Sequence, residues 1–109
     1  MRCGGAIGGN FYVTATNPAG PWSDPVWIDL PGIDPDLAWD EDGNCWCAFA
    51  GASGPSFSGV HVARIDPKAG KVLEGPVPAW AGTGLQWPEA PHLYRIGEWW
   101  YLMIAEGGT

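Results

Sequence analysis

An internal repeat limits the folds that this chain can adopt. Residues 10–27 (NFYVTATNPAGPWSDPVW) and 60–80 (VHVARIDPKAGKVLEGPVPAW) each read as a strand, an Asn-Pro or Asp-Pro turn closed by Gly, and a second strand entered through Pro-Val. Residues 34–51 (DPDLAWDEDGNCWCAFAG) and 89–108 (EAPHLYRIGEWWYLMIAEGG) each read as an acid, a Pro, a short strand, a turn ending in Gly, and a longer aromatic strand. The two kinds of segment alternate with a period of roughly 50 residues and four short strands to the period, which is typical of β-propeller blades.

This period divides the chain into blades. We expect residues 31–80 to form one whole blade, residues 8–30 the outer half of the blade before it, and residues 85–109 the inner half of the blade after it. Propellers close with about four or more blades, so the predicted fold is an all-β propeller fragment of about two blades. An all-β sandwich of about seven or eight strands also fits the length and turn density. The repeat favours the propeller, because a sandwich gives no reason for the acid-Pro-strand-Gly-aromatic pattern to recur.

Composition supports short strands and excludes some partners. The 109 residues include 17 Gly, 11 Pro and 8 Trp, and no helical periodicity persists over about a dozen residues. A net charge of −7 with only 5 Lys+Arg argues against nucleic acid, which needs a positive face to displace its counterions. No apolar run of about 18 residues occurs, and the start MRCGGAIGG has no long apolar region. We therefore expect no membrane partner and no signal peptide.

The cysteines predict packing rather than chemistry. Cys3, Cys45 and Cys47 cannot all pair within the chain, so a disulfide-stapled secreted scaffold is not expected, and the prediction is a reducing, cytoplasmic location. Cys45 and Cys47 share one face of a predicted strand. A zinc site wants about four ligands, and no second Cys/His pair follows. We interpret these two residues as buried structural thiols and predict no metal and no cofactor.

The acidic stretch DEDGN, residues 40–44, invites a calcium interpretation. The calcium loop requires Gly after the third acidic position, whereas Gly43 comes one residue early and no closing Glu follows. A hairpin turn centred on Asp42-Gly43 is the stronger prediction.

Two acids stand near the starts of equivalent predicted strands. Asp34 and Glu89 would both lie near the central axis, because the first strand of a blade lines the channel. Glu89 lies among Trp, Pro and Ala residues, and an apolar environment favours the protonated form that a general acid requires. The alternative is that an acid before Pro merely caps a turn with its side-chain oxygen.

The chain resembles glycoside hydrolase family 43, the five-bladed propeller family of β-xylosidases and α-L-arabinofuranosidases. The resemblance extends from about Gly8 to Thr109 and rests on NFYVTATNPAGPWSDPVWIDLPGIDPDLAWDEDG followed by WPEAPHLYRIGEWWYLMIAEGGT. It implies that Asp34, in the Gly-Ile/Phe-Asp-Pro motif, tunes and orients the acid. It also implies that Glu89, in the Glu-Gly/Ala-Pro-His motif, is the general acid that protonates the leaving oxygen of a glycoside.

The resemblance also indicates what this stretch lacks. The family's general base is an aspartate in the first blade, and no segment of this chain matches that blade, so we expect the fragment alone to be inactive. Inversion needs that second carboxylate roughly 6.5–9.5 Å from the acid. Ala38 stands where the family pattern usually has an aromatic residue, and this difference does not involve either proposed acid.

The predicted partner is an oligosaccharide derived from xylan or arabinoxylan. Trp87 lies beside the acid and is the candidate for stacking on a sugar. His92 is either a second substrate contact or a satisfied core histidine, whereas His61 is expected to be structural. Open blade edges make self-association plausible. The alternative function is a non-catalytic carbohydrate-binding or scaffold module, which the absent base would permit.

Overall fold

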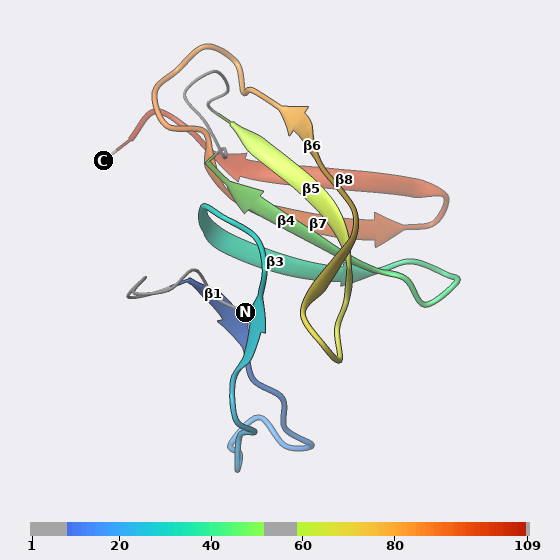
Figure 1. Ribbon diagram of the computed structural model, residues 1–109. Coiled ribbons are helices and arrows are strands. Elements are labelled where there is room, and N and C mark those ends of the chain that lie inside the picture. Colours follow the sequence, from blue (N-terminus) through green and yellow to red (C-terminus); the bar gives the residue numbers. More distant parts are fainter. Residues whose placement is uncertain (1–8, 52–58, 109) are drawn as a thin grey trace.

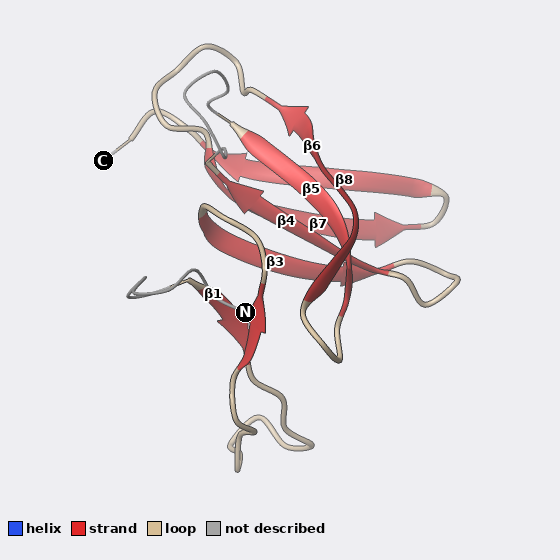
Figure 2. Ribbon diagram, viewed as in Figure 1, coloured by secondary structure: helices blue, strands red, loops and turns tan. Residues whose placement is uncertain are grey.

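The computed structural model describes residues 9–51 and 59–108, and all regular structure in these ranges is β. Fold class is therefore confirmed as all-β (Figure 2). The strands are β1 (Asn10–Tyr12), β2 (Val26–Ile28), β3 (Ile33–Trp39), β4 (Cys45–Ala50), β5 (Val60–Asp66), β6 (Lys71–Trp80), β7 (Glu89–Ile96) and β8 (Trp99–Ala105).

The described strands form three antiparallel sheets in chain order. The sheets are β1-β2, β3-β4-β5-β6 and β7-β8, and each neighbour in a sheet is also the next strand in sequence. Figure 1 shows them as successive layers, with the β7-β8 hairpin beside the four-stranded sheet. A sandwich would have gathered these strands into two facing sheets, so that alternative is wrong.

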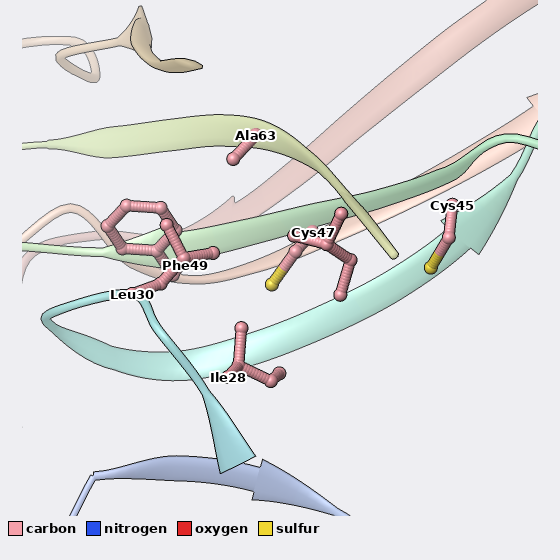
Figure 3. Close-up of a cluster of buried hydrophobic side chains, with 7 residues drawn as sticks. Ile28, Leu30, Cys45, Cys47, Phe49 and Ala63 are labelled. Atoms are coloured by element: carbon pink, nitrogen blue, oxygen red, sulfur yellow. The ribbon is translucent and has the colours of Figure 1, made fainter. Parts of the chain in front are cut away.

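The core lies between the β1-β2 sheet and one face of the four-stranded sheet. Figure 3 shows Ile28 and Leu30 from the β2 side facing side chains of the four-stranded sheet. The buried cluster consists of Ile28, Leu30, Cys45, Cys47, Phe49, Ala63 and Ile65. Alternation along the strand directs Cys45, Cys47 and Phe49 to this face, where each is 1% exposed.

The two cysteines within the described residues are free thiols, as predicted. Burial raises the pKa of Cys45 to about 11 and that of Cys47 to about 12. They fill the core as small apolar groups. Cys3 lies outside the described residues.

The turns of the repeat use the same chemistry in both copies. The side-chain oxygens of Asn17 and Asp66 accept hydrogen bonds from the backbone N–H two residues later, at 2.9 and 2.8 Å. Gly20 and Gly70 then donate their backbone N–H to the carbonyls of these same two residues, at 2.8 and 2.7 Å. The matching turns predicted from the sequence are thus confirmed.

Gly70 also joins two sheets. Its carbonyl accepts the N–H of Asp29 at 3.1 Å, and its φ is +70°. A Cβ at this position would collide with the carbonyl oxygen of Trp27. Only glycine allows the β5-β6 turn to approach the β1-β2 sheet this closely.

The DEDGN segment is the turn between β3 and β4. Oδ1 of Asp40 accepts the N–H groups of Asp42 and Asn44 at 3.0 and 2.9 Å. Oδ2 accepts hydrogen bonds from Asn44 Nδ2 and Trp46 Nε1, both at 3.0 Å. The hydrogen bond from Trp46, followed by that from Asn44, lowers the pKa of Asp40 to about 2. The predicted hairpin is confirmed, but its turn is centred on Glu41-Asp42, because Gly43 donates its N–H to the carbonyl of Asp40 at 3.2 Å.

The first strands of the two later sheets contain the same bulge. The pairing of β3 with β4 shifts between Ile33 and Asp36, and that of β7 with β8 shifts between Glu89 and His92. In each pair two residues on the first strand, 34–35 and 90–91, oppose one on the second. A bulge of this kind bends the strand and changes the direction of its side chains.

The shared bulge fixes how the residues of the two strands correspond. The structural repeat places Asp34 in the position of Ala90, since both lie inside the bulge with positive φ values of 56° and 50°. Glu89 is in the position of Ile33, one residue earlier. The two acids therefore lie near the starts of equivalent strands, but they do not occupy equivalent positions.

The β7-β8 sheet packs one face against the four-stranded sheet. β7 contacts both β3 and β4, and Trp46, Val62, Leu93 and Trp100 line an apolar hollow of about 230 Å³. The other face carries Tyr94, Tyr101 and Met103, which are 45%, 49% and 54% exposed.

Within the described residues there is no helix of the length and apolarity that crossing a membrane would require.

Candidate functional site

A hydrogen bond brings the two motif acids to one place. Oδ2 of Asp34 accepts the backbone N–H of Ala90 at 3.1 Å, across 56 residues of sequence. Ala90 directly follows Glu89, so Asp34 holds the backbone of the proposed acid. The Asp34 carboxylate thus binds a backbone group of the neighbouring sheet, whereas the turn-capping alternative predicted a bond within its own turn.

A second carboxylate of β3 makes a parallel contact. Oδ2 of Asp36 accepts the N–H of Leu93 at 2.8 Å. The β3 strand therefore holds β7 at two points, on either side of the buried Pro91. Backbone groups that a strand partner would normally satisfy are satisfied here by side chains.

The backbone at this place is strained. The non-glycine residues with positive φ are Asp34, Trp87 and Ala90, at 56°, 50° and 50°, among the described residues. Such conformations cost on the order of 1–3 kcal/mol each and persist where surrounding contacts fix them, often at functional sites. All three lie at Asp34 or within two residues of Glu89, which marks this edge of the sheets as the candidate site.

Glu89 lies in a hollow at this edge. The hollow has a volume of about 170 Å³ and is lined by Ile33, Ala50, Gly51, Gly59, Trp87, Pro88 and Glu89. These residues come from the beginnings of β3, β5 and β7 and the end of β4, which meet at one side of the molecule in Figure 1. Trp87 is 60% exposed, so its indole presents a free surface beside the carboxyl group.

His92 is a surface residue. Its side chain is 48% exposed, and its Nδ1 lies 3.5 Å from Oδ1 of Asp36. Its ring lies beside that of Tyr94, with centroids 6.4 Å apart. His92 therefore lies outside the buried core of the described residues, and its contact with substrate stays a prediction.

His61 is the structural histidine. It is 7% exposed and stacks on Phe49, with ring centroids 5.4 Å apart. Burial lowers its pKa. The structural role predicted for His61 is confirmed.

Two residues that support the site were missed in the sequence. Nδ2 of the buried Asn10 faces the carbonyls of Leu30, Pro31 and Gly32 at 3.2, 3.2 and 3.3 Å, which fixes the chain just before Asp34. Glu106 binds the loop that precedes Glu89. Nothing in the local sequence marks these side chains, because both bind backbone at least 20 residues away.

The described part of the chain contains no group of three or more His, Cys, Asp or Glu side chains arranged to hold a metal ion. The chemical groups gathered at this edge are the carboxyl groups of Asp34 and Glu89 and the indole of Trp87. Glu89 lines a small hollow between two residues of strained backbone, Trp87 and Ala90, and a carboxyl group held at such a place can present a proton to a bound ligand. The adjacent exposed indole offers an apolar face for that ligand.

Comparison with known proteins gives one consistent result. The model of glycosyl hydrolases family 43 matches residues 2–109. The chain is 42% identical over 104 residues to xylosidase/arabinosidase 43B of Humicola insolens, covering 92% of this chain and 19% of that protein. It is 44% identical over 101 residues to the non-reducing end alpha-L-arabinofuranosidase BoGH43B of Bacteroides ovatus, covering 93% of this chain and 18% of that protein.

Solved structures agree with these relatives. Xylan beta-1,4-xylosidase from Bacillus halodurans matches with a TM-score of 0.78 at 35% identity, covering 91% of this chain and 20% of that one. The Bacteroides ovatus xyloglucan-locus GH43B protein matches with a TM-score of 0.76 at 40% identity, covering 91% and 19%. The chain thus spans about a fifth of the length of the proteins that it matches.

Proposed function

Because the chain belongs to glycosyl hydrolases family 43, a family of five-bladed β-propeller enzymes, we propose that it supplies the general acid of an inverting glycosidase. Glu89 is that acid, and Asp34 is the residue that orients it. The substrates are glycosides of xylose or arabinose in xylan-type oligosaccharides, as the names of the relatives suggest.

One observation carries this proposal. The Asp34 carboxylate accepts the N–H of Ala90 at 3.1 Å, so the aspartate of one motif fixes the backbone next to the glutamate of the other. The strained φ values on both sides of this bond indicate a geometry that the fold maintains at a cost. Proton transfer requires a donor held within hydrogen-bond reach of the leaving oxygen.

The chemistry assigns one step to each residue. Glu89 donates its proton to the glycosidic oxygen as the bond to the anomeric carbon breaks, which spares the leaving group a negative charge. Trp87 stacks on a sugar ring beside the hollow, and His92 is proposed as a second contact. Water attacks the anomeric carbon from the opposite face, activated by a carboxylate roughly 6.5–9.5 Å from the acid.

That base is proposed to come from a segment beyond these 109 residues. On the same proposal β1-β2 and β7-β8 are the outer and inner halves of adjacent blades, and the exposed face of Tyr94, Tyr101 and Met103 packs on a further blade. In the isolated chain this apolar face favours self-association, which sedimentation velocity would detect as a concentration-dependent rise in mass.

A graft tests the proposal. Residues 9–108 replace the matching segment of the Humicola insolens xylosidase/arabinosidase 43B, and hydrolysis of arabino- and xylo-oligosaccharides is measured for the graft and for its Glu89→Gln variant. We expect the graft to be active and Glu89→Gln to lose about 10²–10⁴-fold in kcat, the usual contribution of a general acid. The isolated chain should be inactive.

Glu98→Gln is the matched control, because Glu98 lies in the β7-β8 turn, at the end of the hairpin away from Glu89. It should leave kcat unchanged. Equal activity of the graft and its Glu89→Gln variant would refute the acid role. A folded graft that binds oligosaccharide without hydrolysing it would favour the non-catalytic module.

A further inference from the structure

Glu106, just after β8, binds the loop that leads to Glu89 through its carboxylate. Oε1 of Glu106 accepts the N–H groups of Thr83 and Leu85 at 2.8 and 3.1 Å. Oε2 accepts the Thr83 hydroxyl at 2.7 Å and its N–H at 3.0 Å. Both oxygens are therefore engaged by one short loop, and hydrogen bonds to a charged acceptor are the stronger kind.

Gly107 and Gly108 make further contacts with the same loop. Gly107 donates its N–H to the carbonyl of Gln86 at 2.7 Å. A Cβ at Gly108 would collide with the ring of Trp87, so the Gly108 backbone lies directly against the indole. We call residues 106–108, together with their partners in 83–87, the Glu106 clamp.

The clamp ends at the site. Trp87 has a φ of 50° and is 60% exposed, so one side of its ring rests on protein and the other is free. A strained residue with an exposed side chain keeps its conformation only where neighbouring contacts fix it. In this structure the clamp provides those contacts, two residues before Glu89.

We propose that Glu106 is a positioning residue that fixes the Trp87 indole at the hollow, so that the ring is preorganised to stack on a saccharide. This inference rests on the proposed function, because it assigns Trp87 to the substrate. Preorganisation of this kind reduces the cost of ordering the site when ligand binds. If Glu106 merely closed a surface turn, its loss would loosen the loop without moving the indole.

NMR of the 109-residue chain tests the clamp without requiring activity. Glu106→Gln keeps the size of the side chain but replaces one acceptor oxygen with an NH₂ group that faces donors. We expect amide exchange at Thr83 and Leu85 to accelerate about tenfold or more and the Trp87 indole N–H signal to shift. The Ala63 amide in β5 reports global stability and should be unchanged.

Two further variants keep the test decisive. Glu98→Gln, in the β7-β8 turn, should leave all of these signals in place. Thr83→Val removes only the hydroxyl donor to Oε2 and should give a smaller displacement of the same signals. Faster exchange at Thr83 and Leu85 with an unmoved Trp87 signal would overturn the positioning role. Unchanged exchange in Glu106→Gln would overturn the clamp itself.

A titration with xylobiose separates this inference from the proposed function. In the wild-type chain the Trp87 indole signal should respond to xylobiose, and the affinity should be several-fold weaker in Glu106→Gln. Equal affinities would overturn the positioning role and leave the proposed function standing. No response of Trp87 in the wild type would contradict its assignment to the substrate, whereas the exchange rates would still decide the clamp.

Discussion

Replacing Asp36 with Ala should loosen the attachment of β7 to β3. The Asp36 carboxylate accepts the N–H of Leu93 at 2.8 Å, and its side chain is 25% exposed. Asp36→Ala leaves that N–H without its acceptor at a partly buried position. We expect the two sheets to lose one of the two hydrogen bonds by which β3 holds β7.

The size of the effect follows from the kind of bond. Hydrogen bonds to charged groups contribute about 1.5–3 kcal/mol, and partial exposure reduces this to roughly 1–2 kcal/mol. For a domain of this size that loss lowers the melting temperature by about 5–10 °C. Asp36→Asn keeps an acceptor oxygen and should lose less than half as much.

Urea unfolding followed by tryptophan fluorescence measures the change, and hydrogen exchange at Leu93 locates it. The Leu93 amide should exchange about tenfold faster in Asp36→Ala than in the wild type. Asp42→Ala, in the exposed β3-β4 turn, is the control and should stay within about 0.5 kcal/mol of the wild type. An Asp36→Ala variant with wild-type stability and wild-type protection at Leu93 would refute the reasoning.

Three further predictions concern the four-stranded sheet. Phe49→Ala should lower the free energy of unfolding by about 3–5 kcal/mol, because Phe49 is 1% exposed; a loss under about 1 kcal/mol in urea would contradict the packing. The folded-state pKa of Asp40 is about 2, below its ordinary 3.8. The ionised carboxylate therefore stabilises the folded chain above pH 4, and this stabilisation is lost as the pH falls towards 2. Stability should therefore fall less steeply over that window in Asp40→Asn, and equal slopes would argue against the Trp46 hydrogen bond. Cys45 and Cys47, with pKa values raised to about 11 and 12, should resist iodoacetamide at pH 8 until the chain unfolds, as peptide mapping would show; rapid labelling of the folded chain would contradict their burial.

Local chemistry explains why much of the fold could be predicted. The side-chain acceptors of Asn17 and Asp66 bind backbone N–H groups two residues away. A short stretch of sequence is therefore enough to predict each turn. The alternation that buries Cys45 and Cys47 is likewise a property of one strand. A repeated pattern of such signals was enough to predict the blade-like order of strands.

The site could be predicted only in part, because its contacts join distant segments. Asp34 and Glu89 lie near the starts of equivalent strands, as the sequence suggested, but the bulge that both strands share was not predicted. Bulges depend on the hydrogen-bonding register between strands, which a residue pattern does not specify. Glu106 was missed for a related reason, since it binds Thr83 across 23 residues of sequence.

If Glu89 gives a proton to the leaving oxygen, the activity lost in Glu89→Gln depends on how readily that oxygen leaves without the proton. In the active graft, kcat of Glu89→Gln is compared with that of the parent on xylobiose and on nitrophenyl β-xyloside. Nitrophenolate leaves without protonation, whereas a sugar alkoxide does not. We expect a loss of about 10²–10⁴-fold on xylobiose and a much smaller loss on the nitrophenyl glycoside if Glu89 is the acid. Equal losses on the two substrates would contradict it.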